Sequence, residues 1–414
     1  MAISITAEPT SGDLIAAYIP GANDFEVEVT VSTGELPPKI KTYATFYKIG
    51  TGTVVDTSIE LPHEYSSLAT LTYSFDVDMN GRVQAYFDSL GIFPTLDTYP
   101  SGVSDGLGID YVLTATSVRA TGTDDTYQDV ATATSSAITS VNANRDLTQA
   151  QNMTAYDANT SVSSFFTNKP NNTVVDYSTN EWLTVHDANN KYRVRVQYYD
   201  STGLLATRYF YITGTTIGEN NTGKIGLIPC GPVGIDAVGA AGRFLASATA
   251  FPMETNGVTH YDIRVEDSGP TNYTDTRTYY IQACNPSYRL HFVNLLGGID
   301  SLLVSRYKNE TTSATGTNYA TAKHSGNTAQ VSGTQVLQKV GSPGIAFKMA
   351  NLSEAEMLWL RNLVLSNAVR LEKDGAYISL IVTKADLQAE DELGQTYSFD
   401  FEAEYSNKIE GLRN

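Results

Sequence analysis

The sequence has few cysteines and few basic residues for its length. Its 414 residues include 2 cysteines, and 27 lysines and arginines stand against 45 aspartates and glutamates, which gives a net charge of −18. Two thiols, Cys230 and Cys284, are too few for the disulfide framework of a secreted scaffold, so we expect both to be reduced. A strongly acidic chain repels nucleic acid, and we therefore expect no sequence-specific nucleic-acid binding.

Long hydrophobic runs are also missing. No window approaches the roughly 20 apolar residues that a membrane-spanning helix needs. The first residues, MAISITAEPTSGD, have neither the charged nor the apolar region of a secretory signal peptide. We therefore expect a chain that is made and folded in a cytoplasm and that does not span a membrane.

The sequence lacks a recognisable catalytic or metal-binding constellation. Its five histidines are far apart and show no HxxxH, HxH or CxxC-type spacing. The run Gly102–Gly106 spells a hydrolase nucleophile elbow, but prolines precede it where that motif needs a strand. We predict no catalytic, cofactor-binding or metal-binding residues and no cofactor. A pair of carboxylates for glycoside hydrolysis remains an open alternative, because it needs only two acids at the right separation.

One stretch partly matches a calcium-binding loop. Asp76, Asp78, Asn80 and Gly81 have the alternating ligands and the turn glycine of such a loop. The bidentate glutamate that completes the loop is replaced by Phe87. We therefore predict that the aspartates lie on the exposed face of a strand whose other face is Phe75, Val77 and Met79, and that the segment from Asp76 to Gly81 does not bind calcium.

Residues that favour sheets are abundant. Tyrosine occurs 26 times and threonine is frequent, while many short alternating runs are separated by turn clusters. A chain of this length is expected to form two to four domains of roughly 100–200 residues. We predict a mainly β protein with a smaller α+β part. It would have an immunoglobulin-like or fibronectin-like sandwich over 1–135, a second sandwich module over 136–285 and an α+β domain over 286–414.

The α+β domain is predicted to be built on a hairpin. The run from Tyr288 to Tyr307 alternates, breaks at Gly297–Gly298 and resumes, which indicates two strands around a tight turn. Both glycines are expected to adopt backbone angles that other residues resist. The following segment, about 309–344, is polar and long for a loop. We expect it to be either disordered or an exposed arm that packs on another chain.

A helix is predicted after this segment. Ser353 and Glu356 have the spacing of a capping box, and Met357, Leu360, Leu363 and Val364 form an apolar stripe. Trp359 and Arg361 lie off this stripe and are therefore predicted to contact a partner. Trp359 is the stronger candidate, because aromatic side chains dominate interface energies.

The C-terminal part of the chain resembles a viral family. The run from Tyr288 to Asp300, YRLHFVNLLGGID, is similar to the RLxFxNxxGGxD segment of virion proteins from tailed phages and prophages of Bacteroidota, including crAss-like phages. The blocks 352–371 and 399–407 are similar too. The resemblance covers roughly 255–410 and implies a structural component of the tail, neck, ring or baseplate, with no catalytic residues.

These observations predict a non-enzymatic structural subunit of a bacteriophage virion, most readily a ring, collar or tail component. Its expected partners are further copies of itself in a symmetric oligomer and other virion proteins. The alternative is a carbohydrate-binding adhesin or receptor-binding fibre or baseplate component, which would present exposed tyrosine platforms to a host glycan.

Overall fold

A computed structural model describes the chain over the following ranges: 2–9, 14–17, 23–31, 40–49, 59–61, 71–88, 108–120, 127–141, 143, 164–187, 192–211, 224–245, 249–267, 274–282, 287–305, 309–320, 334–366, 368–373, 376–391, 396–406 and 409–410. The Gly102–Gly106 run and Cys284 lie outside these ranges. The protein is mainly β with a small α part, as the sequence predicted. No helix in the described ranges is long and apolar enough to cross a membrane.

The chain forms two compact units. The first comprises Met1–Thr167, Tyr177–Tyr280 and Leu295–Ile299, and the second comprises Asn168–Asp176, Ile281–Asn294 and Asp300–Asn414. The second unit therefore includes a short segment, Asn168–Asp176, that lies within the second sandwich module predicted from the sequence, 136–285.

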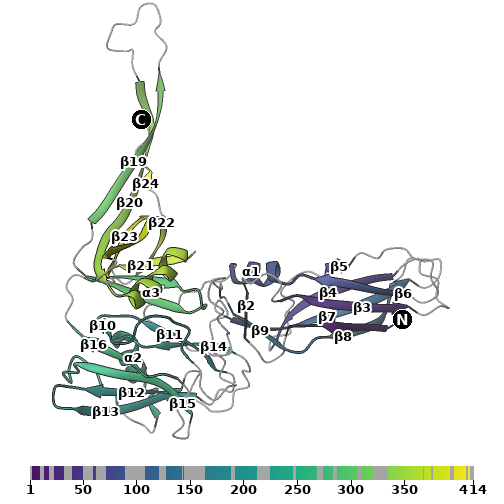
Figure 1. Ribbon diagram of the computed structural model, residues 1–414, viewed down its shortest axis with the longest axis horizontal. Coiled ribbons are helices and arrows are strands. Elements are labelled where there is room, and N and C mark those ends of the chain that lie inside the picture. The colour runs from purple at the N-terminus through teal and green to yellow at the C-terminus, as the bar shows by residue number, and fades with distance from the viewer. Residues whose placement is uncertain are drawn as a thin grey trace, which may run out of the picture. The chain divides into compact units, whose positions relative to one another are not determined.

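The N-terminal part of the first unit is a β-sandwich-like arrangement of two sheets (Figure 1). Residues Phe25–Val31 alternate between apolar and polar side chains and form β3, whose Phe25, Val27 and Val29 are at most 2% exposed. Both sheets and the helix α1 (Asn80–Asp88) contribute side chains to one hydrophobic core. The first sheet has the order β1 (Ala2–Ala7), β3 (Phe25–Val31) and β6 (Leu71–Val77). The second has the order β2 (Leu14–Ala16), β9 (Ile138–Val141), β7 (Gly108–Ala120), β4 (Ile40–Lys48) and β5 (Ile59–Leu61), with β8 (Tyr127–Thr134) also paired to β7.

The rest of the first unit contains two further groups of paired strands. The strands β12 (Tyr192–Tyr199) and β13 (Leu204–Tyr211) form a hairpin, and its turn is closed by Asp200, whose side chain accepts from the Gly203 amide at 3.0 Å. Within this unit the sheet has the order β16 (Arg277–Ile281), β15 (His260–Asp267), β12 and β13. A second pair joins β11 (Trp182–Asp187) to β14 (Lys224–Pro229), and the helix α2 (Pro232–Ala240) follows. No periodic pattern predicts β14 or α2, because both are apolar along most of their length.

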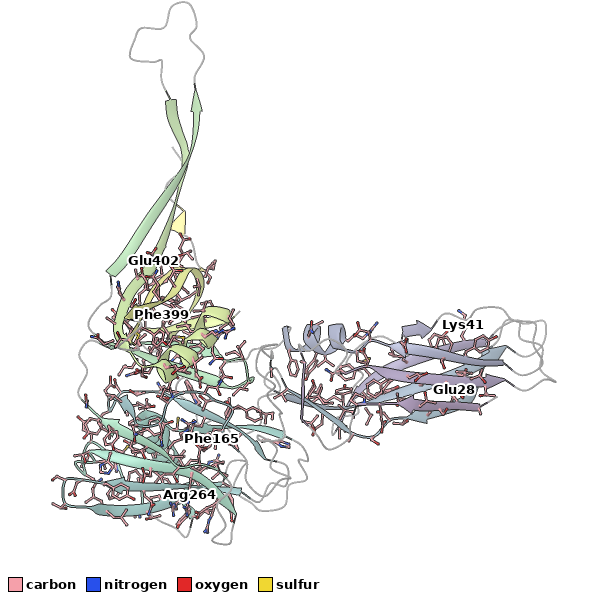
Figure 2. All side chains as sticks on the ribbon, in the orientation of Figure 1. Glu28, Lys41, Phe165, Arg264, Phe399 and Glu402 are labelled. Atoms are coloured by element: carbon pink, nitrogen blue, oxygen red, sulfur yellow. The ribbon has the colours of Figure 1, made fainter. Side chains whose placement is uncertain are left out.

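The second unit is organised around one large sheet. Its strands have the order β18 (Ile299–Ser305), β17 (Ser287–Val293), β21 (Val369–Lys373), β22 (Ala376–Asp391), β23 (Thr396–Tyr405), β20 (Thr334–Leu352) and β19 (Asn309–Ala320), with β24 (Ile409–Glu410) also paired to β20. The short strand β10 (Thr173–Val175) belongs to the same unit. Phe399 and Glu402, both on β23, differ in environment: Phe399 is fully buried, whereas Glu402 is exposed (Figure 2).

The helix α3 (Glu354–Leu365) packs on this sheet, and its start is the capping box that the sequence predicted. The Glu356 amide donates to Ser353 Oγ at 3.3 Å, and the Ser353 amide donates to Glu356 Oε2 at 2.8 Å. The helix contributes Trp359, Leu360 and Leu363 to the core of the second unit, whose aromatic part includes three phenylalanines in mutual contact. Burial of this face stabilises a helix that is only three turns long.

The polar segment after β18 forms a hairpin. β19 pairs with β20 in an antiparallel register from Asn309 opposite Ala346 to Ala320 opposite Thr334. On its other side β20 meets β23 from Gly344 to Leu352 and β24 at Val340 and Gly341. From Lys339 to Thr334 the described strands contain no third partner, so the end of the hairpin is a two-stranded ribbon that projects from the sheet (Figure 1). We call this hairpin, β19 with Thr334–Pro343 of β20, the arm.

Candidate functional site

Charged side chains form a buried network between β17 and β21. The register places Arg289 opposite Glu372, so that both side chains lie on one face of the sheet. Arg289 donates to Glu372 Oε1 at 3.1 Å and to Asp176 Oδ1 at 2.8 Å, and the three side chains are 8%, 10% and 7% exposed. A guanidinium between two carboxylates satisfies the strict requirement that buried charge be paired.

The network continues through a histidine to a serine. His291 Nε2 lies 2.9 Å from Glu372 Oε2, and His291 Nδ1 lies 2.8 Å from Ser301 Oγ. Serine, histidine and carboxylate in a hydrogen-bonded row is the order of groups found in hydrolase triads. No sequence pattern predicts this row, because Ser301 and Glu372 are distant in the chain and each is an ordinary strand residue.

The burial of the row argues for a structural role. His291 is 0% exposed and Ser301 is 3% exposed, so a substrate cannot contact the serine hydroxyl in this arrangement. The Ser301 carbonyl also accepts a hydrogen bond from Lys169 Nζ at 2.8 Å, which links β18 to the segment that contains Lys169. The row therefore joins β17, β18 and β21 through polar contacts that replace hydration.

The burial of Trp359 is at odds with the prediction that this residue contacts a partner. It is 5% exposed and lies in the core of the second unit, 6.0 Å from Phe292 between ring centroids. Its indole Nε1 donates to Asp300 Oδ2 at 2.9 Å, and Lys169 Nζ lies 5.4 Å from the ring centroid. The predicted stripe placed Met357 and Val364 in the core, but both are only partly buried, and the helix instead turns Trp359 and Asn362 inward. The reason is Asp300, a buried acceptor that helical periodicity cannot reveal.

The structure also describes the three remaining predicted positions, one on α3 and two in the turn between β17 and β18. Arg361 is partly exposed on α3. In the predicted turn, Gly297 has a φ of 84°, a conformation that side-chain-bearing residues resist. Gly298 is not among the glycines with positive φ in the described ranges.

The calcium-like stretch lies at the end of β6 and the start of α1 (Asn80–Asp88). Asp76 and Asp78 are exposed, and burial together with the Asp78 carboxylate raises the pKa of the nearby Asp24. Phe87, at the position of the missing glutamate, is fully buried in the core. Within the described ranges no group of three or more histidine, cysteine, aspartate or glutamate side chains is arranged to hold a metal ion.

The solvent-facing side of the sheet formed by β16, β15, β12 and β13 has an aromatic row. The rings of Tyr199 and His260 are stacked at 4.7 Å, and those of His260 and Tyr280 are stacked at 5.5 Å. A spacing near the distance between strands means that each ring covers its neighbour's face. This row therefore presents ring edges rather than the broad flat platform that sugar binding would use.

Toward the other end of β12 and β15, basic side chains surround one acid. Glu266 is 3% exposed and is reached by Arg193 at 3.1 Å, Arg264 at 2.7 Å and Arg195 at 3.8 Å. Arg264 lies on β15 (Figure 2). Burial and the neighbouring Arg264 lower the pKa of Arg195. The arginines are therefore committed to an intramolecular cluster on this face.

Together, the sheets and these sites define a mainly β, sandwich-like protein whose chemically notable groups are buried in its own cores. No protein-family model and no curated protein sequence matches the chain. Among solved structures, it is similar to an uncharacterized protein, lmo2446 from Listeria monocytogenes EGD-e, at 9% identity over 98% of this chain, with a TM-score of 0.17. A second structure of that protein, in complex with α-D-glucose, β-D-glucose, magnesium and calcium, matches at 10% identity with the same TM-score. The chain spans 30% of the length of that protein.

Proposed function

We propose that this protein is a non-enzymatic structural subunit of a bacteriophage virion, which assembles with further copies of itself into a ring, collar or tail. The observation that carries the proposal is the arm. An isolated two-stranded ribbon is only marginally stable in water. The projecting end of the arm therefore gains stability when it lies against another protein surface, and a neighbouring copy in a symmetric assembly supplies one.

The composition of the arm supports this role. Its strands are rich in Thr, Ser, Gly and Asn, from NETTSATGTNYA in β19 to the TQVLQKVGSPG half of β20. Such a ribbon has little apolar surface with which to form a core of its own. It can nevertheless donate and accept backbone hydrogen bonds along its free edge.

The buried chemistry supports a structural rather than a catalytic reading. The Ser301–His291–Glu372 row and the Arg289 pairs hold strands together in a place that substrate does not reach. The resemblance of the C-terminal part to phage virion proteins adds the proposed location, the virion, and the proposed partners, other virion proteins. Immunoglobulin-like decoration is the corresponding proposal for the N-terminal sandwich.

The test is to shorten the arm at a register pair. Ser313 lies opposite Ser342, so replacing 314–341 with an Asn-Gly turn closes the hairpin and leaves the first five pairs intact. We expect the variant to keep its circular dichroism and to sediment as a monomer under conditions in which the parent assembles. Negative-stain microscopy of the parent would show the closed or open form of the assembly.

A matched control removes only the residues between the strands. Replacing 321–333 with the same turn joins Ala320 to Thr334, which are also opposite each other, and leaves the whole arm. This control should assemble like the parent. Assembly of the variant that lacks 314–341 would overturn the role of the arm, and glycan cleavage by the purified protein would overturn the non-enzymatic proposal.

A further inference from the structure

The large sheet of the second unit has an open edge in its middle. β21 pairs with β22 only from Val369 opposite Leu380 to Lys373 opposite Ala376. Beyond Leu380, β22 continues to Asp391 and is paired on its other side with β23. Among the described strands, none pairs with this part of β22 on the β21 side. The segment Ile381–Asp391, which we call the open edge, therefore presents a strand's backbone in the manner of a sheet edge.

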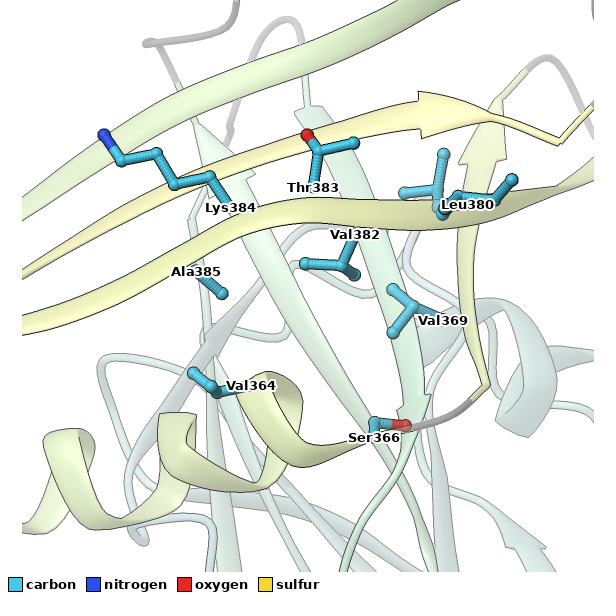
Figure 3. A pocket seen from close by; sticks show the side chains of 9 residues that line it. Val364, Ser366, Val369, Leu380, Val382, Thr383, Lys384 and Ala385 are labelled. Carbon is cyan, nitrogen blue, oxygen red and sulfur yellow. The ribbon is translucent and has the colours of Figure 1, made fainter.

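A hollow runs along the start of the open edge (Figure 3). It has a volume of about 470 Å³ and is lined by five consecutive residues of β22, Ile381 to Ala385. Successive side chains of a strand point to opposite faces of the sheet. All five can line one hollow only if the hollow lies beside the strand, where a neighbouring strand would be.

Four further residues complete the lining of the hollow. Val364 at the end of α3, Val369 at the start of β21 and Leu380 contribute to its wall, with Ser366 beside them (Figure 3). Ile381 lines it too and is 50% exposed, which is unusual for an isoleucine. A free backbone edge beside a hollow is an arrangement that can bind an added β-strand: the backbone gives affinity and the hollow accepts side chains of the added strand.

The same sheet provides a strand that fits. β19 is the last strand of the sheet order, so its outer edge is open among the described strands and faces away from the open edge of β22. The two segments also match in length: β19 has 12 residues, Asn309–Ala320, and the open edge runs from 381 to 391, which is 11 residues. One sheet thus has two free edges of similar length that point in opposite directions.

We propose that β19 in the arm of one copy docks along the open edge of β22 in a second copy, so that the sheet continues from subunit to subunit. This inference rests on the proposed function and names its interface. The contact is head-to-tail, because the two surfaces that meet are different. Repetition of such a contact gives a ring when the rotation closes and a filament when it does not.

The first test blocks the open edge with a charge. Lysine on an edge strand is a common natural barrier to strand pairing. Ile381→Lys places it in the hollow at a half-exposed position, so we expect the fold to persist and the dissociation constant of assembly to rise by about tenfold or more. Thr383→Lys, at another exposed position that lines the hollow, should act in the same way. The matched control is Leu204→Lys, since Leu204 is 54% exposed on a different sheet and should leave assembly unchanged.

The second test uses two defective variants together. The variant lacking 314–341 has an intact open edge and no projecting arm, whereas the Ile381→Lys variant has an intact arm and a blocked edge. Each should be monomeric by sedimentation, and their mixture should form a one-to-one dimer that grows no further. A symmetric contact between two open edges predicts the opposite, namely that the variant without the arm dimerises by itself.

The outcomes separate this inference from the proposed function. If the parent assembles and shortening the arm abolishes assembly, but Ile381→Lys and Thr383→Lys assemble normally, the docking site on β22 is wrong and the structural role stands. If the mixture of the two variants fails to pair while each is folded, the head-to-tail contact is also wrong. A parent that stays monomeric at its highest soluble concentration overturns both proposals.

Discussion

Several buried side chains contribute to stability through one specific hydrogen-bond partner. Trp359 is the clearest case, because its ring is in the core and its indole N–H is bonded to the buried Asp300. Replacing Trp359 with Phe keeps most of the apolar contact and removes the donor. We expect this change to lower the free energy of unfolding by about 1–3 kcal/mol, the cost of leaving a buried polar group short of a partner. Urea denaturation would measure it.

A double-mutant cycle with Asp300→Ala, which removes the acceptor, is the control for Trp359. If the hydrogen bond carries the effect, each single change already removes it. The double variant should then lose less stability than the sum of the two single losses, by a coupling energy above about 0.5 kcal/mol. Parent-like unfolding of Trp359→Phe combined with weaker assembly would instead return Trp359 to an interface.

Glu372 is shared by a guanidinium and an imidazole. Replacing it with Ala leaves Arg289 and His291 buried without this carboxylate, and we expect a loss of about 3–5 kcal/mol in the free energy of unfolding. Glu372→Gln keeps the shape and one acceptor oxygen and should cost less. The pair is compared by urea denaturation. Equal and small losses for both variants would show that the network contributes little to stability.

Asp236 on α2 should make the stability of the first unit depend on pH. Burial raises the pKa of Asp236 to about 6, although the Met253 amide donates to both carboxylate oxygens at 3.3 Å. Because the folded pKa is above the ordinary value of 3.8, the folded state binds this proton more tightly. The resulting stabilisation is fully present below about pH 4 and is lost as pH rises through about 6.

Asp236→Asn tests that linkage, since an amide keeps an acceptor for Met253 and does not titrate. Melting temperatures measured from pH 4 to 7 should fall less steeply for the variant than for the parent. Parallel curves would mean that Asp236 does not titrate in this range.

At the scale of elements, the turn between β17 and β18 depends on one glycine more than on the other. Gly297 has a φ of 84°, and an alanine forced into a left-handed conformation costs about 1–2 kcal/mol. Gly297→Ala should therefore lower the melting temperature more than Gly298→Ala. Calorimetry of the two variants compares them directly, and a larger effect at Gly298 would indicate that packing, rather than backbone conformation, controls this turn.

Local sequence signals predicted the elements that depend on neighbouring residues. The capping box at Ser353 and the turn at Gly297 are each contained within a few residues, and both are present in the structure. The burial of Trp359 depends on Asp300, and the Ser301–His291–Glu372 row depends on the pairing of β17 with β21. No local pattern carries such pairings, because they are fixed by the sheet order.

The structure of the arm also could not be predicted from local sequence patterns alone. Its residues have no apolar periodicity, so the sequence left a choice between disorder and an extended segment. Its two strands are nevertheless paired along their length, with one register shift between Thr317 and Asn318, and β20 continues from the arm into the sheet. Because β20 is held in the sheet by β23, it extends beyond the core together with its partner β19.

For the whole molecule, the charge should govern how copies meet. Each chain has a net charge of −18, so copies repel at low ionic strength, and salt screens this repulsion over roughly 8–10 Å at physiological concentrations. A contact made by backbone hydrogen bonds and apolar side chains is not weakened by the same salt. We expect the assembled fraction, measured by sedimentation, to rise as salt increases from low to physiological levels. Dissociation with added salt would show that ion pairs hold the subunits together.

The order in which the ribosome releases the chain bears on the second unit. Asn168–Asp176 emerges early, yet Asp176 is bonded to Arg289, and Arg289 also waits for Glu372. The strand β20 pairs in turn with β23, which follows it in the chain. This sheet therefore completes its pairing only after Tyr405 has left the ribosome. Under the proposed docking, the open edge of β22 becomes a binding site only once β23 has paired with the other side of β22.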